Sequence, residues 1–570
     1  MAEKEVEDGA ASHDSEILTT PLEHDSKYEQ YPTRNFRFHL AFVSVCACTF
    51  IATVDTVIVA TALPAITRAL HATSNEAYWC GTGFLFAQTV SQPLYGAFQE
   101  VVGHKRTMMF ALGLFLFMSI FCATAKNITW LVTSRVIQGI GGGGINAMVN
   151  VLVSDLVPLH DRGTFAGLNN LAGAVGLVSG VVLGAAFAEK STWRLIFWIN
   201  LPICTIAGAG IFLGVRLKTE TDSIRSQLHK VDYLGALLLI SSLVSILYGL
   251  TGGGILYPWS HARIITALVI GGLGIVLTAL YEVKYAPHPM IPPAIFRDRT
   301  AVSGYFSAWV HGIVLWALAY YLILYFLIAR GHSLLHSALE ILPGIATIPV
   351  CAALFGIIMA ITKHFKWLNV FAWASLSIGV GLLALLTAHT GLGKAYGYQI
   401  VLAVGGGIIF PGRILAVQVS QKPANVPIAT TMVSFFTSLG EAFGVAIGGS
   451  IFQNRWSALT KDAITSGRLP REYLINSDAA EGSAERLKLL PFGVRDAYRG
   501  IMAESLRTLW ITFAALAAAA FFVSLIARDL SLAEKRDEGD LEEAHTPEVM
   551  ATTSQNKRSE ARGAADNEAA

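Results

Sequence analysis

Apolar stretches of about twenty residues, separated by short polar segments, dominate the chain between residues 39 and 527. A helix of that length crosses the roughly 30 Å hydrocarbon core of a bilayer. The pattern therefore predicts fourteen membrane-spanning helices. Their predicted ranges are 39–61, 79–99, 107–125, 130–153, 165–188, 195–215, 233–252, 262–282, 302–326, 337–361, 368–388, 397–419, 428–452 and 505–527.

The polar segments include both ends of the chain. Residues 1–36 are polar and do not have the pattern of a cleavable signal, and residues 528–570 are rich in Glu, Lys, Ala and Asp. We expect both to be disordered cytoplasmic tails. The connection 453–504 is predicted to be an extracellular loop, in which Val494–Leu506 has the pattern of an amphipathic helix on the membrane surface.

Composition agrees with a protein embedded in lipid. Of 570 residues, 53% are hydrophobic and 14% are charged, and the formal net charge is +1. A water-soluble fold could not cover so much apolar surface, and nothing in this charge favours nucleic acid. The cysteines fall within apolar runs without metal or disulfide spacing, so we expect no metal. They are Cys46, Cys48, Cys80, Cys122, Cys204 and Cys351.

Lys and Arg are unevenly divided between alternate loops, and the richer set normally faces the cytoplasm. One set is roughly twice as rich as the other, which predicts cytoplasmic termini. The sequon at Asn127 then faces outward and is a candidate glycosylation site. The richer set contains Lys105, Arg106, Arg162, Arg216, Lys218, Arg225, Lys230, Lys284, Arg297, Arg299, Lys363, Lys366 and Lys422.

A weak internal repeat divides the chain. The segment GIGGGGINAMVNVLVSDLVP of the fourth span corresponds to VGGGIIFPGRILAVQVSQKP of the twelfth. The match holds if spans one to six and nine to fourteen are two copies, an arrangement usual in secondary transporters. We therefore expect a six-helix bundle over 37–216, cytoplasmic loops and two inserted helices over 217–300, and a second six-helix bundle over 301–527.

The fourth span contains RVIQGIGGGGINAMVNV, whose glycines have the spacing of a dinucleotide-binding loop. Such a loop must connect a strand to a helix in a soluble fold, so that reading is rejected. Arg135, Gln138, Asn146 and Asn150 share one stripe of the predicted helix. An arginine at the bilayer centre costs about 2.5–3.5 kcal/mol, so the stripe must face the bundle interior. It either holds helices together or lines a cavity.

Two carboxylates lie inside predicted spans, Asp55 in the first and Glu441 in the thirteenth. Burial disfavours the charged form of a carboxylate, so each is a candidate for gaining and losing a proton. For Asp55 the alternative is a permanent pair with a buried cation, for which Arg135 is the candidate. Glu441 is also a candidate for binding a cationic substrate. Arg413 is either the counterpart of Arg135 or the cap of a helix broken after Pro411.

Aromatic and amide side chains at helical spacing suggest a cavity for bulky amphipathic molecules. Span nine presents aromatic residues on one face with a histidine beside them, and span two presents two glutamines. The alternative is that these side chains face lipid or the helix core. The candidate cavity residues are Gln88, Gln92, Gln138, Asn146, Trp309, His311, Trp316 and Tyr320.

Over about residues 39–527 the chain resembles the major facilitator superfamily. The segments RVIQGIG (135–141) and GAFQEVVGHKR (96–106) are similar to that family's fourth-span and cytoplasmic gate motifs. VDTVIVATALP (54–64) and WRLIFWINLP (193–202) resemble its fourteen-span drug:proton antiporter branch. HPMIPPAIFRDRT (288–300), with the segment 429–452, is similar to fungal toxin and multidrug efflux pumps.

The resemblance implies an all-α integral membrane protein with the major facilitator fold, its fourteen helices forming two six-helix bundles plus two inserted helices. It also implies roles for three groups of residues. Val181 replaces a proline expected in the antiporter motif, and Glu100 an aspartate commoner in the gate motif. The groups are Asp55, Arg135 and Glu441 for proton coupling, Gly96, Glu100, Gly103, Lys105 and Arg106 for the cytoplasmic gate, and Gly176, Gly180 and Gly184 for antiporter-motif packing.

The function expected from these observations is secondary active export of hydrophobic or amphipathic small molecules, such as a toxin, secondary metabolite or drug. The resemblance implies proton antiport with alternating access in the plasma membrane, or alternatively in the vacuolar membrane, by a monomer. The sequence has no Walker motif and no persuasive catalytic dyad, so we expect neither a cofactor nor an enzyme. The alternatives are a proton-coupled importer of a siderophore or nutrient, and a transporter-like ligand sensor.

Overall fold

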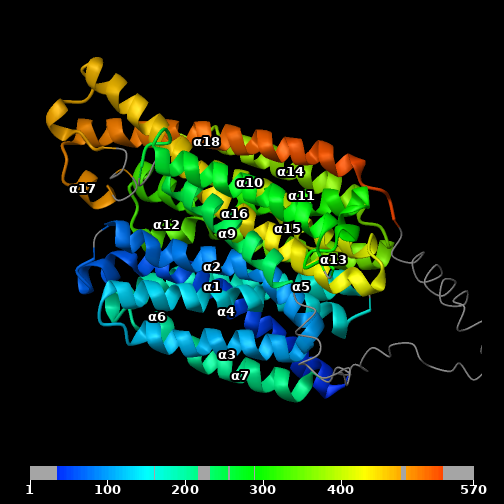
Figure 1. Ribbon diagram of the computed structural model, residues 1–570. Coiled ribbons are helices and arrows are strands. Elements are labelled where there is room, and N and C mark those ends of the chain that lie inside the picture. Colours follow the sequence, from blue (N-terminus) through cyan, green and yellow to red (C-terminus); the bar gives the residue numbers. More distant parts are fainter. Residues whose placement is uncertain are drawn as a thin grey trace, which may run out of the picture.

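The computed structural model describes residues 35–530, apart from residues 73, 159–160, 216–231, 254–256, 288, 477–479 and 481–482. Most of both predicted tails lies outside the described residues, and so do Arg216, Lys218, Arg225 and Lys230 of the predicted cytoplasmic set. The described chain is a bundle of long helices that run in roughly the same direction (Figure 1).

The first half of the chain forms one group of helices. A short break at Ile199 separates α6 from α7, and together they correspond to the sixth predicted span. The helices are α1 (Phe36–Ala69), α2 (Ser74–Val102), α3 (His104–Ala123), α4 (Ile128–Leu156), α5 (Arg162–Lys190), α6 (Leu195–Trp198) and α7 (Asn200–Gly214).

Two helices follow that belong to neither repeat, α9 (Tyr233–Gly252) and α10 (Ala262–Lys284). They pack against each other, and α9 also contacts α2 and α16. A short 3-10 helix, η1 (Pro293–Phe296), leads into the second half. These elements are the two inserted spans that the sequence predicts.

The second half begins with α11 (Arg299–Leu324), which continues as a five-residue π-helix, η2 (Tyr325–Ala329). Short helices η3 (Pro423–Asn425), η4 (Arg471–Tyr473) and α17 (Ala484–Lys488) lie in its connections. The remaining helices are α12 (Leu334–Glu340), α13 (Leu342–Thr362), α14 (Lys366–Leu383), α15 (Leu392–Val419), α16 (Val426–Thr465) and α18 (Phe492–Ile526).

The predicted all-α membrane fold is confirmed. Among the described residues, 13 helical segments are long and apolar enough to cross a bilayer, and no strand occurs. The remaining predicted span corresponds to α2, a 29-residue helix packed on α4. Its lower hydropathy comes from side chains such as Gln88, Gln92 and Gln99, which are buried inside the bundle.

Helix packing repeats between the two halves. In the first half α1 packs on α5, α2 on α4 and α3 on α4, and in the second half α11 packs on α16, α13 on α15 and α14 on α15. The halves meet where α5 packs on α13 and α16 packs on α2. The inner face of each half therefore consists of corresponding helices.

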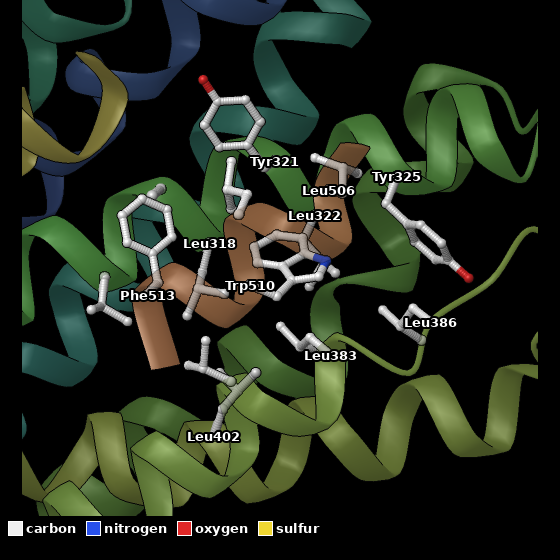
Figure 2. Packing of buried hydrophobic residues seen from close by; sticks show 14 of the residues in the cluster. Leu318, Tyr321, Leu322, Tyr325, Leu383, Leu386, Leu402, Leu506, Trp510 and Phe513 are labelled. Atoms are coloured by element: carbon white, nitrogen blue, oxygen red, sulfur yellow. The ribbon is translucent and has the colours of Figure 1, made fainter. Parts of the chain in front are cut away.

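Each half has an apolar core of its own. In the second half, Trp510 of α18 is fully buried and lies between Leu318 and Leu322 of α11 and Leu383 of α14 (Figure 2). In the first half, α1, α3, α4 and α7 bury a separate cluster that includes Phe115 and Phe197. A third apolar cluster, which includes Phe86 of α2 and Met432 of α16, joins the two halves.

Two helices are longer than predicted. α16 runs on to Thr465 and α18 begins at Phe492, so the two ends of the predicted loop 453–504, half of its length, are helical (Figure 1). Val494–Leu506 is the first part of α18 and does not form a separate surface helix. The reason is packing: the rings of Trp456 and Tyr498 stack 5.5 Å apart, and the Tyr498 hydroxyl donates to the Tyr473 carbonyl (2.8 Å).

The start of α1 and the end of α18 lie at the same end of the bundle, on the right in Figure 1. We call this the terminal end. There the Arg528 amide donates to the Thr300 hydroxyl (3.1 Å), and His364 lies 3.3 Å from Asp529. α12 and α17 lie at the opposite end.

Candidate functional site

Asp55 of α1 and Arg135 of α4 form an ion pair in the core of the first half. Their side chains are 0% and 1% exposed. The guanidinium also donates to the Gln138 side-chain oxygen (2.9 Å) and stacks on Phe84, whose ring centre lies 4.0 Å away. The structure thus brings together the carboxylate and the arginine that the sequence suggests as partners.

Two side-chain amides donate further hydrogen bonds to this carboxylate. Asn200 at the start of α7 donates to Asp55 Oδ1 (2.8 Å), and Gln138 donates to the same oxygen (3.3 Å). Both amides also donate to the Ser119 hydroxyl of α3. A buried ion pair needs such additional hydrogen bonds to offset its desolvation. The network therefore joins α1, α3, α4 and α7 into one unit.

A cavity of about 260 Å³ lies between the two halves. The first half contributes α1, α2, α4 and α5, and the second contributes α11, α13, α15 and α16. Most of the surface of its wall is apolar, and amides, hydroxyls, an imidazole and two charged groups make up the rest. Pockets of this kind suit small organic molecules that are largely apolar. Its polar lining includes Thr49, Thr53, Thr56, Gln88, Asn146, Asn150, Asn169, Asn170, His311, Gln399, Arg413, Ser434, Thr437, Ser438 and Glu441.

The charged groups of the cavity come from the second half. Arg413 of α15 is buried and donates to Nδ1 of His311 on α11 (2.6 Å), while Nε2 of His311 lies 3.0 Å from the Gly406 carbonyl. These partners require a neutral ring that carries its proton on Nε2. Arg413 Nε has no hydrogen-bond partner among the described residues. Glu441 of α16 is the only carboxylate in the described lining.

The two arginines lie on corresponding helices of the repeat, but not at corresponding positions, because Arg413 aligns with Met148. Arg135 on α4 pairs with α1, and Arg413 on α15 pairs with α11. The partner differs, because Asp55 is an anion whereas His311 is neutral. The first half therefore neutralises its arginine in dry packing, and the second half leaves its arginine facing a cavity that contains Glu441.

Four of the eight residues predicted to line the cavity do so: Gln88, Asn146, His311 and Trp316. The other four lie outside the lining: three contact other side chains, and the fourth is partly exposed. Gln138 turns toward Asp55, and Gln92 donates to the Ser438 hydroxyl (2.8 Å). Trp309 packs edge-on against Phe443, and Tyr320 is 37% exposed beside Tyr321. Asp55 and Arg135 are likewise absent from the described lining.

Close backbone contact shuts the space between the halves toward the terminal end. A Cβ added at Gly167 of α5 would lie 2.6 Å from the Cα of Ala353 on α13, and one at Gly163 would lie 2.6 Å from the Gly356 carbonyl oxygen. Hydrogen bonds cross the same region, from Asn150 to Ser434 (3.1 Å) among others. Small residues at such a contact let two helices approach closely.

The predicted gate residues differ in their contacts: some lie between the two halves, and others lie within the first half or are exposed. A Cβ at Gly96 would lie 2.7 Å from Ile428 of α16, so this glycine lies at the contact between halves. Gly103 has φ +88° at the start of α3. Lys105 instead donates to the Phe212 and Val215 carbonyls (both 2.7 Å) and thereby caps α7 within its own half. Side chains of Glu100 and Arg106 are exposed.

Two other predicted groups lie on helix contacts or helix ends. Gly176, Gly180 and Gly184 pack α5 directly on the backbone of α1. Asn127 is exposed and caps α4, because its side-chain oxygen accepts from the Trp130 amide (2.8 Å).

Sequence reasoning missed several polar residues of the cavity wall. Asn169 and Asn170 are consecutive amides inside an apolar run, a signal that is visible in the sequence. Asn169 lies 2.7 Å from the Thr49 hydroxyl, which donates to it. Gln399 was not distinguishable from the surface of its helix by pattern alone.

Comparisons with known proteins agree on one family. The sequence model of the family described as Major Facilitator Superfamily matches residues 45–445. The MFS transporter L2 of a Phoma species is 35% identical over 493 residues, which cover 86% of this chain and 81% of that protein. The MFS-type efflux pump MMF1 of Pseudozyma antarctica is 32% identical over 528 residues, covering 91% and 97%. Efflux pump dotC of Dothistroma septosporum is 33% identical over 488 residues, covering 85% and 83%.

Solved structures share the fold. The proton:xylose symporter XylE superposes with a TM-score of 0.53 at 13% identity, covering 87% of this chain and 97% of that one. The human organic anion transporter MFSD10 superposes with a TM-score of 0.51 at 14% identity, covering 85% and 99%.

Proposed function

The chain belongs to the major facilitator superfamily, and from this premise we propose that it exports hydrophobic or amphipathic small molecules by proton antiport. Membership makes it a multi-pass membrane transporter and not an enzyme. Fungal relatives named efflux pumps support the outward direction. A plasma-membrane location, cytoplasmic termini and a monomeric state remain predictions from the sequence.

The observation that carries the proposal is the cavity between the halves. Its wall is largely apolar, with leucine and isoleucine side chains opposite a few amides. An apolar wall binds the body of an organic molecule, and scattered amides orient its polar groups. Sugars and small ions would leave much of this wall without suitable partners. The lining therefore supports an amphipathic cargo.

We assign the proton-carrying step to Glu441. It faces the same cavity as Arg413, whose hydrogen-bonded neighbour His311 is neutral. When Glu441 is ionised, its charge balances that of Arg413; when it is protonated, the arginine is left uncompensated. Proton binding therefore changes the net charge of the cavity, and a cationic or polar cargo group can replace the proton beside Glu441. This competition between proton and cargo couples proton movement to cargo export.

The Asp55–Arg135 pair has a different part in the proposal. It is sealed from the cavity, so a proton reaches Asp55 only after α1 or α4 moves. We assign this pair to the charge rearrangement that accompanies movement of the first half. The glycine contact between α5 and α13 is the terminal gate, which separates when the opposite end closes.

The test uses purified protein in proteoliposomes with rhodamine 6G as a hydrophobic cargo. Wild-type protein should drive dye accumulation against an imposed pH gradient and should exchange labelled for unlabelled dye without one. Glu441→Gln, which keeps the side chain's size, should retain exchange and lose gradient-driven accumulation. Thr437→Ser, one turn away on the same cavity wall, is the matched control and should retain both activities.

The outcomes separate the alternatives. Gradient-driven transport that survives in Glu441→Gln would refute the assignment of the proton. Accumulation driven only by the gradient of opposite sign would identify a proton-coupled importer. Saturable dye binding without exchange in the wild-type protein would identify a ligand sensor.

A further inference from the structure

Three metal-ligating side chains converge at the end of the bundle opposite the terminal end. His332, His336 and Glu340 are spaced by four residues, with the last two on one face of α12. His332 Nδ1 lies 2.9 Å, and His336 Nε2 3.2 Å, from Glu340 Oε1. All three candidate donor atoms lie within 4.8 Å of one another. None of them belongs to the cavity lining.

The carboxylate of this cluster is buried without hydrogen bonds. Glu340 is 3% exposed, and among the described residues neither of its oxygens has a hydrogen-bond partner. The imidazole nitrogens are close enough for ion pairs, yet His332 Nδ1 also lacks a hydrogen bond of acceptable geometry. A buried carboxylate left in this way is costly. The two imidazole nitrogens and the carboxylate oxygen are close together without pointing at one another, which is the arrangement expected of ligands that share one ion.

We propose that His332, His336 and Glu340 bind a Zn²⁺ ion. Two imidazoles and one carboxylate form a donor set that zinc uses in proteins, with metal–ligand distances near 2.0–2.2 Å. Three protein ligands leave a further position for water. The ion's charge would compensate that of the buried Glu340 carboxylate, whose oxygens have no hydrogen-bond partner among the described residues. Mg²⁺ and Ca²⁺ fit poorly, because they prefer oxygen ligands.

The backbone around the cluster is held in place without a metal. Ser333 begins α12, its hydroxyl accepting from the His336 amide (3.3 Å). The His332 amide donates to the Phe326 carbonyl (3.1 Å), which fixes the residue before the helix. Gln399 donates to the Glu340 carbonyl (3.1 Å). The backbone that carries the three donors is therefore preorganised, and a metal need order only their side chains.

The site would act on the cavity through its neighbours. Ile341, directly after Glu340, lines the cavity, as does Gln399. α12 also contacts α5 of the other half. A bound ion ties the segment before α12 to its last turn, and so stiffens the cavity wall at the end opposite the terminal gate. This inference concerns a ligand that the proposed export cycle does not use.

Direct binding tests the proposal independently of transport. Tag-free protein in detergent is titrated with ZnCl₂ in competition with a chromophoric chelator. We expect one saturable equivalent in the wild type and at least about tenfold weaker affinity in His336→Ala and Glu340→Gln. His336 is 59% exposed, so its truncation leaves packing intact. His389→Ala, which removes an 80% exposed histidine, is the control and should bind as wild type.

Three results of the zinc titrations would overturn the inference. They are absence of a saturable equivalent in the wild type, equal affinity in His336→Ala and wild type, or loss of binding in His389→Ala. Size-exclusion profiles establish that each variant is folded. A fourth result, displacement of Zn²⁺ by equimolar Mg²⁺, would refute the donor chemistry.

Discussion

Replacing Asp55 by Asn tests the energetics of the sealed ion pair. The change keeps the side chain's size but leaves the Arg135 guanidinium, 1% exposed, without its anion. Removing one partner of a buried pair costs about 3–5 kcal/mol. Arg135 keeps its bonds to Gln138 (2.9 Å) and the Cys80 carbonyl (3.4 Å) and its stacking on Phe84. We therefore expect the lower value, about 3 kcal/mol, or roughly 150-fold in the unfolding equilibrium.

The assay is reversible unfolding in mixed micelles of increasing SDS content, followed by tryptophan fluorescence. Arg135→Gln and the double variant complete a double-mutant cycle, which should give a coupling of about 0.5–3 kcal/mol. Asp462→Asn is the matched control. It breaks an ion pair of 2.6 Å whose side chains are 66% and 65% exposed, so its effect should be about 1 kcal/mol or less.

One result would refute the reasoning: an Asp55→Asn variant as stable as Asp462→Asn. The pair would then be solvated, and its placement in dry packing would be incorrect. The sequence alone predicts that Asp55→Asn abolishes gradient-driven transport and leaves folding intact. The geometry changes the expectation about folding: the Asp55 carboxylate balances the buried Arg135 cation, so its loss should lower stability.

Two further predictions concern the terminal end. Gly167→Val should force α5 away from Ala353, because the added side chain overpacks this contact by about 1–3 kcal/mol. A cysteine introduced at Ser434 should then be labelled faster. The control is Gly113→Val, whose Cβ meets nothing within 4 Å and which should not change the labelling rate. Unchanged labelling in Gly167→Val would count against the gate. Lys105→Met removes the cap of α7 and should cost about 0.3–1 kcal/mol in SDS unfolding, whereas Arg106→Met should cost less. Equal losses would mean that the cap contributes nothing.

Most of the fold could be predicted because hydrocarbon imposes a simple length rule on helices. The rule fails where a helix leaves the membrane and packs on protein. α16 and α18 extend past their predicted ends because Trp456 and Tyr498 bury each other there, and no local pattern distinguishes that burial from a polar loop. α2 was found despite its glutamines, because the apolar run around them is long enough.

The candidate site was only partly predictable. The sequence predicts Asp55 and Arg135 as partners, because few other charged residues lie inside the predicted spans of the first half. The bond between His311 and Arg413 was missed, because it depends on α11 lying beside α15, which a lone histidine among aromatics does not reveal. The four-residue spacing of His332, His336 and Glu340 is visible in the sequence, but the helix that holds the last two is only seven residues long and begins after His332.

The unequal treatment of the two buried arginines has an electrical consequence. The charges of Asp55 and Arg135 sum to zero, so carrying this pair through the transmembrane field does no net work. Arg413 is balanced only while Glu441 is ionised, and in the proposed cycle the protonated carrier therefore has one extra positive charge. Carrying that charge through the whole field is worth about 2.3 kcal/mol per 100 mV. Membrane voltage alone, without a pH difference, would thus select the direction in which the protonated carrier faces.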